Sequence, residues 1–515
     1  MSSNVRKHIL LLPFPAYGHV IPLLEFGRKI HRYHDVTLAV SSCIVKDLKQ
    51  RELISDADFP IVAIPDGFTG FEGFNHQNWV DSQTLALPAI ADLLRAIPIT
   101  QRPSTVSGDD PDDEIPDGER FVWLVNGQSN GMSGHPLCGQ SVRGERSLRC
   151  LDGRSVANGE LCPLQERSTW SLGNDDAPKP LEVCHDRGIP FLYLNTAPAS
   201  MILGALFVDE NYPTIPESDD DILSFIEVPS PEAPLPPMPE AFKTHMLEIN
   251  RIASMVSGII VNSVRALEDD MARAIETFPL MKGIPLMFVG PLMPQTEKIS
   301  AGQLEQQERV EKWLDRREKL SVTYVSFGSI AVPTGEQIAE VAQALLATGK
   351  PFIWSLPKAK QHHLPAELTS RISEQFQGED SRFLILAWAP QKLILQHPAT
   401  SVFLSHCGWN SSLESLAAGL PVLAWPMFAD QKVNAELLVE RSTALMVEGT
   451  GLKPKRVVPA EEIARLLRRI GGEQTTDTIF RAAAREWKFI LDAALAAGGS
   501  SEKAFRAVIE FADNT

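Results

Sequence analysis

Apolar and polar positions follow the same rhythm in two separate stretches of the chain. Near the start, the apolar run HILLLPFP is followed by HVIPLLEFGRKIHRY, whose apolar positions have helical spacing, and then by the strand-like DVTLAVSS. The rhythm restarts at SVTYVSFGS (321–329), with GEQIAEVAQALLATGK as a helix and PFIWSLP as the next strand. Strand–helix alternation of this kind is typical of α/β proteins with parallel sheets. The pattern therefore predicts two doubly wound domains in tandem.

The seam between these domains is expected near residues 290–307, where proline and polar residues replace the periodic pattern. Beyond it, RFLILAW, TSVFLSH, LESLAAG and PVLAWP continue the second domain. We therefore expect an N-terminal domain over 1–295 and a C-terminal domain over 296–498. The remaining residues, 499–515, have the pattern of an amphipathic helix that returns to the N-terminal domain.

Residues 101 to about 173 depart from this rhythm. Only FVWLV (121–125) has the pattern of a strand, and the rest is first acidic and then rich in Gly, Ser and Arg. Such a composition cannot bury enough apolar surface to order itself unaided. A structureless stretch of this length is also unusual inside a compact domain. We interpret it as a largely irregular surface insertion or as an aberrant piece of the coding sequence.

Charge and cysteine content exclude several classes of function. The chain of 515 residues has 48 basic and 65 acidic residues, for a net charge of −17. An acidic surface disfavours binding to nucleic acid and to anionic membranes. No stretch reaches the roughly 18 apolar residues that a membrane span requires. Six cysteines are few for a chain of this length and favour a reducing compartment. We therefore expect a soluble, cytoplasmic protein.

A cluster of small polar groups, SHCGWNSSLES (405–415), joins two apolar elements. If it connects a strand to a helix, Asn410 is a natural N-cap and Ser411 lies in the first turn. The first N–H groups of a helix have no internal partner and its dipole is positive there, so an anion such as a diphosphate is the expected guest. His406 can donate a further hydrogen bond, and Glu414 can accept bonds from sugar hydroxyls. Anion and diol together indicate a nucleotide.

Two neighbouring loops extend this site. Trp388, at the end of another predicted strand, offers a flat face on which a base can stack. Asp430 and Gln431 follow the strand LAWPMFA and place a carboxylate and an amide where a second sugar can be bound. Ordinary helix caps and a core tryptophan would explain each of these residues singly. All of them, however, fall at carboxyl ends of strands, where α/β sheets bind ligands, so we predict a nucleotide-sugar site.

Residues 388–431 closely resemble the signature box of the plant-type UDP-glycosyltransferases of family 1. WAPQ, HPATSVFLSHCGWNS, a following acid, GLPVLAWP and DQ stand in the order of the family. PFPAYGHVIPLLEFGRKI, VGPL, EKWLD, SVTYVSFGS and GGSS are also similar to family segments. The resemblance covers the chain except for residues 101 to about 173. It implies the glycosyltransferase B fold, in which two Rossmann-like domains face a cleft, with the acceptor bound by the N-terminal domain and the UDP-sugar by the C-terminal domain.

The resemblance also implies a role for each matching residue. It assigns uracil stacking to Trp388, nucleoside contact to Gln391, the ribose hydroxyls to Glu414, the diphosphate to His406, Asn410, Ser411 and Ser329, and the transferred sugar to Trp409, Asp430 and Gln431. A closing Gln is usual in members of the family that use UDP-glucose. Trp409 stands where glucuronate users tend to carry Arg. UDP-glucose is therefore the expected donor.

Sugar transfer requires a base that removes the proton of the acceptor hydroxyl. His19, in the expected loop PAYGHV, has a side chain whose pKa suits this task. The family places an Asp behind this base, after a strand. Counting back from RGIPFLYLNTAPAS (187–200), the register falls on Asn174, Asp175 and Asp176, and we predict Asp175, although STWSLG is a poor strand. The alternative acids, within 109–117, are expected to form a solvated face. We expect no metal or other cofactor, because the helix terminus and His406 stabilise the leaving UDP.

Three functions remain open. The first is an inverting UDP-glucose-dependent transferase acting on a small lipophilic alcohol or phenol. The second is a UDP-sugar-binding protein with little or no transfer, because residues 101–173 displace the catalytic Asp. The third is another enzyme of the same fold, such as an epimerase, against which the signature box argues. Cys138, Cys150, Cys162 and the nearby His135 lack the tight pairing of zinc ligands, so no metal site is predicted. The acceptor and the oligomeric state are left open.

Overall fold

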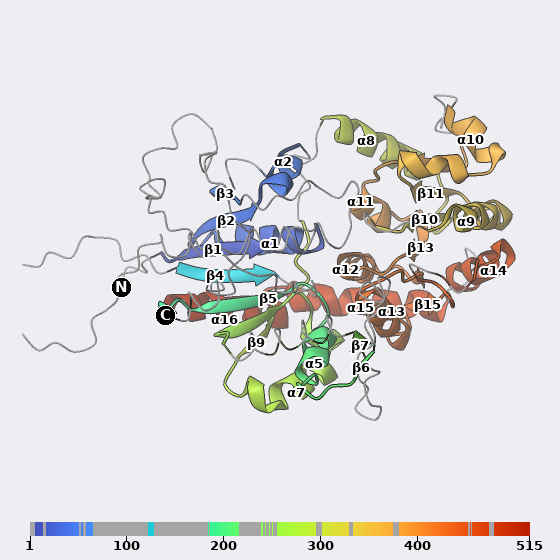
Figure 1. The fold of residues 1–515 in the computed structure, drawn as a ribbon. Coiled ribbons are helices and arrows are strands. Elements are labelled where there is room, and N and C mark those ends of the chain that lie inside the picture. Colours follow the sequence, from blue (N-terminus) through green and yellow to red (C-terminus); the bar gives the residue numbers. More distant parts are fainter. Residues whose placement is uncertain are drawn as a thin grey trace, which may run out of the picture. The chain divides into compact units, whose positions relative to one another are not determined.

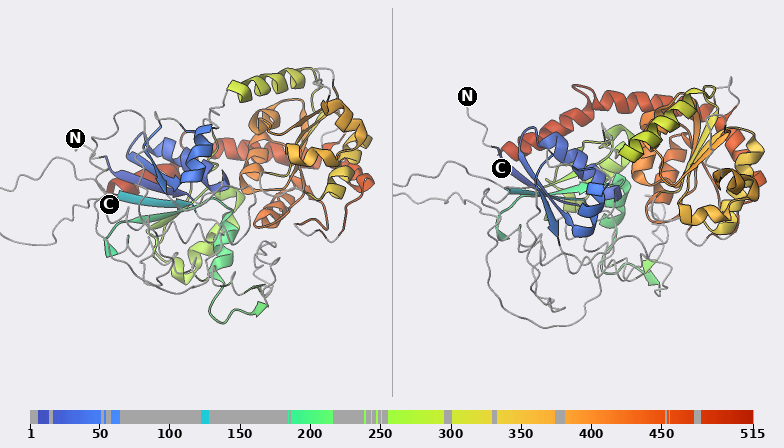
Figure 2. Two further views of the ribbon diagram at one scale, coloured as in Figure 1. Left: turned by 45° about the horizontal axis from the view of Figure 1, so that its top comes forward. Right: turned by 90° about the horizontal axis from the view of Figure 1, so that it is seen from above.

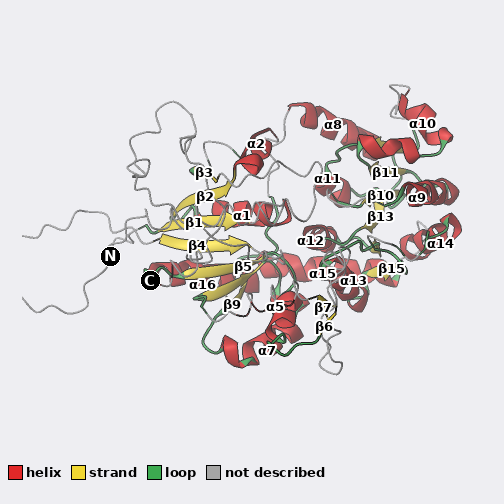
Figure 3. Ribbon diagram, viewed as in Figure 1, coloured by secondary structure: helices red, strands yellow, loops and turns green. Residues whose placement is uncertain are grey.

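The computed structural model of the chain describes residues 6–13, 17–50, 53–54, 58–64, 122–127, 184, 186–215, 238–239, 243, 247, 250, 255–294, 301–328, 333–373, 381–451, 454, 456–472 and 478–514. Two compact units divide the chain: unit 1 comprises 1–214, 240–298 and 501–515, and unit 2 comprises 215–239 and 299–500. Each unit is built on its own parallel sheet (Figures 1 and 3). Within the described residues, no helix is both long and apolar enough to cross a membrane.

Unit 1 contains a seven-stranded parallel sheet with the order β3-β2-β1-β4-β5-β8-β9. Its strands are β1 (His8–Pro13), β2 (Asp35–Ser41), β3 (Ile61–Ile64), β4 (Val122–Gly127), β5 (Phe191–Asn195), β8 (Gly258–Val261) and β9 (Leu286–Phe288). From β1 the chain first extends the sheet to one side and then, from β4 onward, to the other, which is the doubly wound topology. Residues 9–12 of β1 are all at most 6% exposed, as expected for a parallel strand covered on both faces.

The helices of unit 1 include one from the end of the chain. They are α1 (Tyr17–Ile30), α2 (Ser42–Gln50), α5 (Ala199–Leu206), α7 (Asp269–Thr277) and α16 (Ser500–Asn514), with 3-10 turns at Arg265–Leu267 and Pro279–Met281. Phe505 of α16 meets Phe26 of α1 edge-on, with 5.8 Å between ring centroids. Figure 2 shows α16 lying beside α1.

A separate two-stranded sheet pairs β6 (Thr214–Ile215) with β7 (Met238–Pro239).

One feature of unit 1 differs from expectation and another agrees with it. The first helix begins at Tyr17, so His19 lies in its first turn and not in a loop, and Pro22 is inside the helix. The one strand expected in the stretch 101–173 is confirmed, because residues 122–125 of FVWLV lie in β4, which pairs with β1 and β5. Apart from β4, the stretch 101–173 lies outside the described residues.

Unit 2 contains a six-stranded parallel sheet with the order β12-β11-β10-β13-β14-β15. Its strands are β10 (Val322–Ser326), β11 (Phe352–Ser355), β12 (Phe383–Leu386), β13 (Thr400–Ser405), β14 (Val422–Ala424) and β15 (Ala444–Met446). The chain runs from β10 outward to β12 and then returns to β13 on the other side of β10. The strand order therefore reverses between β10 and β13, and α/β sheets bind ligands at such a point.

The helices of unit 2 follow the strands in the predicted alternation. They are α8 (Ala301–Asp315), α9 (Gly335–Thr348), α10 (Ala366–Ser373), α11 (Gln391–Gln396), α12 (Trp409–Ala418), α13 (Gln431–Glu440), α14 (Ala460–Gly471) and α15 (Ile479–Leu495), with a 3-10 segment at Lys358–His363. Thr334 caps α9 through a bond from the Gln337 N–H, and Gly349 ends that helix in the left-handed conformation.

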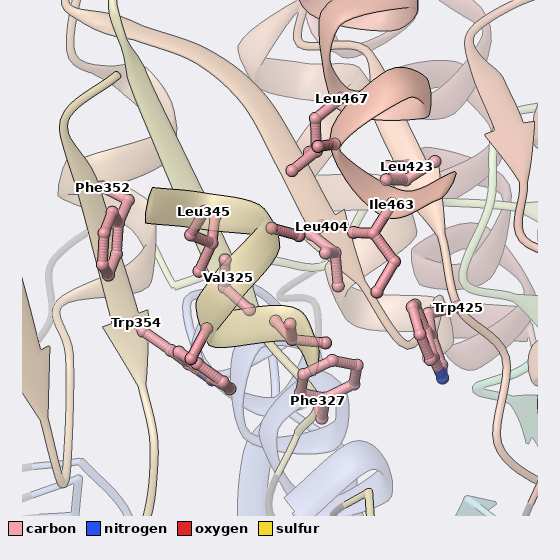
Figure 4. Packing of buried hydrophobic residues seen from close by; sticks show 14 of the residues in the cluster. Val325, Phe327, Leu345, Phe352, Trp354, Leu404, Leu423, Trp425, Ile463 and Leu467 are labelled. Carbon is pink, nitrogen blue, oxygen red and sulfur yellow. The ribbon is translucent and has the colours of Figure 1, made fainter. Parts of the chain in front are cut away.

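One apolar core holds the sheet of unit 2 against α9 and α14. Figure 4 shows Val325, Leu404 and Leu423, from three neighbouring strands, packed beside Leu345 of α9 and Ile463 of α14. All of these side chains are at most 1% exposed. Burying each contributes roughly 1.5–3 kcal/mol relative to leaving it exposed. The carboxyl edge of this sheet is therefore a rigid support for side chains.

Candidate functional site

Most of the predicted site residues gather at the carboxyl edge of the unit 2 sheet. His406 directly follows β13, Trp388 follows β12, and Asp430 and Gln431 follow β14. Because all six strands are parallel, their carboxyl ends lie at one edge of the sheet. Ser329 lies outside the described residues, so its predicted contact with the diphosphate stays a prediction.

The turn from β13 into α12 is built differently from the expectation. Cys407 adopts a left-handed conformation with φ +62°, and its N–H donates to Ser405 Oγ at 3.1 Å. Gly408 is the N-cap of α12 and uses no side chain for capping. The predicted N-cap, Asn410, instead lies in the first turn with Ser411, because the left-handed residue starts the helix earlier. The first backbone N–H groups of α12 still lack partners from their own helix.

His406 is held in a tight space at the start of this turn. A methyl group added to Gly328 or to Gly408 would lie 2.6 Å from His406 Nε2. Burial lowers the pKa of His406 to about 4. The Nδ1 atom is buried and has no hydrogen-bond partner among the described residues. The imidazole is therefore neutral near neutral pH, and it offers a ligand a hydrogen bond but no charge.

A hydrogen-bond network joins the next three predicted residues. Tyr324 of β10 donates its hydroxyl to Gln391 Oε1 at 3.1 Å. Gln391 Nε2 in turn donates to Ser411 Oγ at 3.0 Å and to Glu414 Oε2 at 2.6 Å. These bonds fix which end of the amide faces which partner. Sequence reasoning missed Tyr324, because its position in a buried strand looked purely structural.

The loop that carries Trp388 is held by Gln306, a residue of α8 that was not predicted to contact the site. Gln306 of α8 donates a hydrogen bond from Nε2 to the backbone carbonyl of Trp388. The indole itself is half-buried. Because its backbone is held by a hydrogen bond and its ring is partly exposed, Trp388 can serve as a stacking surface. No motif in α8 had indicated this contact, because its partner lies far away in the sequence.

The loop after β14 orients two side chains that are predicted to contact the sugar, Asp430 and Gln431. Gln431 Oε1 accepts the N–H groups of Met427 at 2.9 Å and of Phe428 at 3.2 Å. The Nε2 end of this amide is therefore the end that we expect a ligand to meet. Burial raises the pKa of Asp430, and the carboxylate accepts a bond from Asn434. Trp409, the third predicted sugar contact, is only 4% exposed.

In unit 1, His19 has a hydroxyl partner. The Nδ1 atom of His19 lies 2.7 Å from Thr196 Oγ1, and Thr196 is 3% exposed. Thr196 follows β5, in a turn where Asn195 Nδ2 donates to the carbonyls of Ala197 and Pro198. The turn is therefore rigid, and it sets the orientation of the imidazole. Thr196 was missed although it lies inside the segment quoted for the register of the catalytic Asp.

The predicted partner of His19, Asp175, lies outside the described residues. Its pairing with His19 therefore stays a prediction, as does the solvated face expected for the acids 109–117. Cys138, Cys150, Cys162 and His135 also lie outside them. Among the residues that the structure describes, no group of three or more His, Cys, Asp or Glu side chains is arranged to hold a metal ion.

Comparisons with known proteins place the chain among similar sequences of one family. The family model for "UDP-glucoronosyl and UDP-glucosyl transferase" matches residues 235–461. UDP-glycosyltransferase 84A4 of Arabidopsis thaliana is 32% identical over 532 aligned residues, which cover 100% of this chain and 96% of the relative. Cinnamate beta-D-glucosyltransferase of Fragaria ananassa is 27% identical over 515 residues, covering 99% of this chain and 83% of the relative.

A solved structure supports the fold. The Medicago truncatula protein UGT71G1, crystallised with UDP-glucose, superposes with a TM-score of 0.70 at 21% identity, and the match covers 99% of each chain. The expected glycosyltransferase B fold is thus confirmed. The Arabidopsis relative passes 30% identity over nearly its whole length, and the matched family model includes the loops after β12, β13 and β14. The chain therefore belongs to the UDP-glycosyltransferase family of enzymes.

Proposed function

We propose that this enzyme transfers glucose from UDP-glucose to the hydroxyl of a small lipophilic or phenolic acceptor, with inversion at the anomeric carbon. The observation that carries the proposal is the network of Gln391, Ser411 and Glu414 beside the N-terminus of α12. It offers an amide, a hydroxyl and a carboxylate next to a helix end. This combination suits a nucleoside diphosphate, because the helix N-terminus can bind the phosphates and the carboxylate, one turn further along, can accept hydrogen bonds from the ribose diol.

The donor would be bound by groups of unit 2 alone. Trp388 stacks on uracil, Gln391 contacts the nucleoside and Glu414 accepts the ribose hydroxyls. The diphosphate lies at the first turn of α12, near Asn410 and His406. Since His406 is neutral, the helix dipole and backbone N–H groups balance most of the charge that develops on departing UDP. We therefore infer that transfer needs no added metal ion.

Glucose is favoured as the transferred sugar by the loop after β14. Gln431 presents its Nε2 group because Oε1 is used by the backbone, and Asp430 presents a carboxylate. Together they can donate to and accept from neighbouring sugar hydroxyls. The Fragaria ananassa relative is named a glucosyltransferase, which supports the same sugar. A panel of acceptors should include cinnamate, for which that relative is named, beside simple phenols and alcohols.

His19 would act as the base in unit 1. If Nδ1–H donates to Thr196, Nε2 carries the lone pair that takes the acceptor proton. The acceptor oxygen then bonds to the anomeric carbon while the bond from that carbon to the diphosphate oxygen breaks. A single displacement inverts the configuration. Asp175 remains the proposed carboxylate behind His19, in addition to Thr196.

The cellular site is proposed from the thiols. Cys184 and Cys407 are buried free thiols in the described part of the chain. Free cysteines agree with a reducing compartment, and we propose the cytoplasm.

The test is an assay of the full chain with UDP-glucose and the acceptor panel. We expect a β-glucoside, identified by the coupling constant of its anomeric proton, formed at the same rate with and without EDTA. Loss of activity in EDTA that Mg²⁺ restores would refute the metal-free proposal. If the chain binds UDP but transfers glucose to no acceptor, the alternative of a UDP-sugar-binding protein is correct.

A further inference from the structure

Asn434 of α13 contacts two parts of the donor site at once. It is 0% exposed, and its Nδ2 group donates to Asp430 Oδ2 and to the carbonyl oxygen of Cys407, both at 2.9 Å. An amide nitrogen has two hydrogens, so both are used. The reversed amide would place Oδ1 against a carboxylate and a carbonyl, which are acceptors only. The orientation of Asn434 is therefore fixed by its partners.

The first partner of Asn434 is the carboxylate of Asp430, which is predicted to bind the transferred sugar. Burial raises the pKa of Asp430, and the bond from Asn434 opposes this shift because it stabilises the charged form. The bond also selects one rotamer of a side chain that is one helical turn away. Without it, Asp430 would be both easier to protonate and freer to turn away from the sugar.

The second partner sets the loop that precedes the diphosphate site. The left-handed conformation of Cys407 costs a residue other than glycine roughly 1–2 kcal/mol. It is held at both ends, since Ser405 accepts the Cys407 N–H and Asn434 donates to the carbonyl. The C=O and N–H of one planar peptide point in opposite directions. The bond therefore aims the N–H of Gly408, at the start of α12, away from Asn434.

Asn434 is a costly choice if its role is only to fill the core. Its Oδ1 is buried without a hydrogen-bond partner among the described residues. An unmet buried acceptor costs roughly 1–3 kcal/mol, which an apolar side chain of similar size would avoid. The two bonds from Nδ2 thus need a reason beyond stability.

We propose that Asn434 is a positioning residue that links sugar recognition by Asp430 to the diphosphate-binding loop at Cys407. This inference rests on the proposed UDP-glucose donor. Asp430 contacts only the sugar, whereas α12 contacts the diphosphate. Loss of Asn434 therefore weakens UDP-glucose more than it weakens UDP.

The test compares the affinities of UDP and UDP-glucose, by calorimetry, in wild type, Asn434→Ala and Asn434→Ser. In Asn434→Ala we expect the Kd for UDP-glucose to rise about 10–30-fold, which corresponds to the loss of one charge-assisted hydrogen bond. The Kd for UDP should rise at most about 5-fold, which is less than the loss of one such bond. Asn434→Ser has one hydrogen to donate and should give an intermediate ratio. It also serves if the Ala variant folds poorly.

The matched control is Leu438→Ala, on the same helix and also 0% exposed. It should lower the melting temperature while leaving the ratio of the two affinities unchanged. A double-mutant cycle with Asp430→Asn adds a readout that stability alone does not move. We expect Asp430→Asn to raise the Kd for UDP-glucose in the wild-type background. In the Asn434→Ala background the same substitution should raise this Kd by a factor about threefold smaller, because the effects of contacting residues are not additive.

Two results would overturn the inference. If wild type binds both ligands and the Asn434 variants keep the wild-type ratio, or the cycle is additive, the link through Asn434 is wrong while the proposed function stands. If wild type binds neither UDP nor UDP-glucose, the proposed function fails, and the inference fails with it.

Discussion

At the scale of residues, two histidines have different chemistry because their surroundings differ. His19 has a hydroxyl at Nδ1, which fixes its orientation without supplying a charge. His406 is desolvated between Gly328 and Gly408, and its pKa is lowered to about 4. We propose His19 as the base, whereas burial keeps His406 neutral near neutral pH.

The first prediction concerns stability against pH. The pKa of His406 is lower in the folded chain, so below its ordinary value of 6.5 the unfolded chain takes up a proton that the folded chain does not. Stability is therefore lost as the pH falls from 6.5 toward 4. We expect wild type to lose about 2 kcal/mol more than His406→Asn between about pH 7.5 and pH 5, measured by urea unfolding. The exposed His362→Asn serves as the control and should follow wild type. Parallel pH profiles for wild type and His406→Asn would contradict the assignment.

The second prediction concerns Thr196. Thr196→Val keeps the shape of the side chain but removes the hydroxyl, so the imidazole of His19 loses its partner at Nδ1. We expect kcat to fall about tenfold, the value of one buried hydrogen bond, with the Kd of UDP-glucose unchanged. Thr196→Ser should restore most of the rate. Equal rates in Thr196→Val and wild type would show that Thr196 does not orient the base.

Site residues could be predicted where they lie in a recognisable motif. Residues were missed where their hydrogen-bond partner is distant in the sequence. Trp388, Gln391 and Glu414 lie in the segment that resembles the family, and the resemblance predicts a role for each. Thr196 lies 177 residues from its partner His19, and Asn434 lies 27 residues from Cys407. Only the folded sheet brings such pairs together.

At the scale of elements, a substitution in the loop after β10 tests how the predicted diphosphate site is shaped. Gly328 has φ +80°, and a Cβ there would lie 2.6 Å from His406 Nε2. We expect Gly328→Ala to weaken UDP binding at least about tenfold, because the imidazole must move by an amount that breaks a hydrogen bond. Isothermal calorimetry with UDP gives the measurement.

Gly349→Ala is the matched control for this prediction. Gly349 has φ +69° and no atom within 4 Å of the added carbon. It therefore bears a similar backbone strain, on the order of 1 kcal/mol, without the clash. We expect its UDP affinity to equal that of wild type. A similar loss of affinity in both variants would mean that strain, and not contact with His406, is responsible.

Most strands were predictable because parallel strands buried on both faces have unbroken apolar runs. Their ends were less certain. The predicted N-cap Asn410 is replaced by Gly408, since a left-handed cysteine is not expected from sequence. His19 was placed in a loop because Pro and Gly in the segment suggested one, whereas α1 begins at Tyr17 and continues through Pro22.

At the scale of the whole molecule, the end of the chain completes unit 1. Phe505 contacts Phe26 through their rings, and Val508 of the same helix is 1% exposed. We expect Phe505→Ala to destabilise unit 1 by about 2–3 kcal/mol, which is less than the roughly 3–5 kcal/mol for a fully buried Phe, because Phe505 is only partly buried. Amide exchange should then accelerate in β1 and β2 but not in β10 and β13.

Phe489→Ala is the control, because Phe489 is 73% exposed. It should leave exchange in both units unchanged. If Phe505→Ala changes nothing in unit 1, the packing of α16 is not a source of its stability.

Two α/β units could be predicted from the repeated rhythm, whereas the strand order could not. The position of β4 between β1 and β5 depends on pairing across a long stretch of chain, and composition suggested only one strand there. Rules of topology narrow such choices but do not select the partner of an isolated strand.

The central claim is that donor binding belongs to unit 2 and proton removal to His19 of unit 1. It is tested most directly by measuring UDP-glucose affinity and transfer rate on the same samples of wild type, His19→Ala and Glu414→Ala. His19→Ala should bind UDP-glucose as wild type does while transfer falls by about 10²–10⁴-fold. Glu414→Ala should lose roughly 1–3 kcal/mol of binding free energy. Undiminished transfer by His19→Ala, or undiminished binding by Glu414→Ala, would contradict the claim.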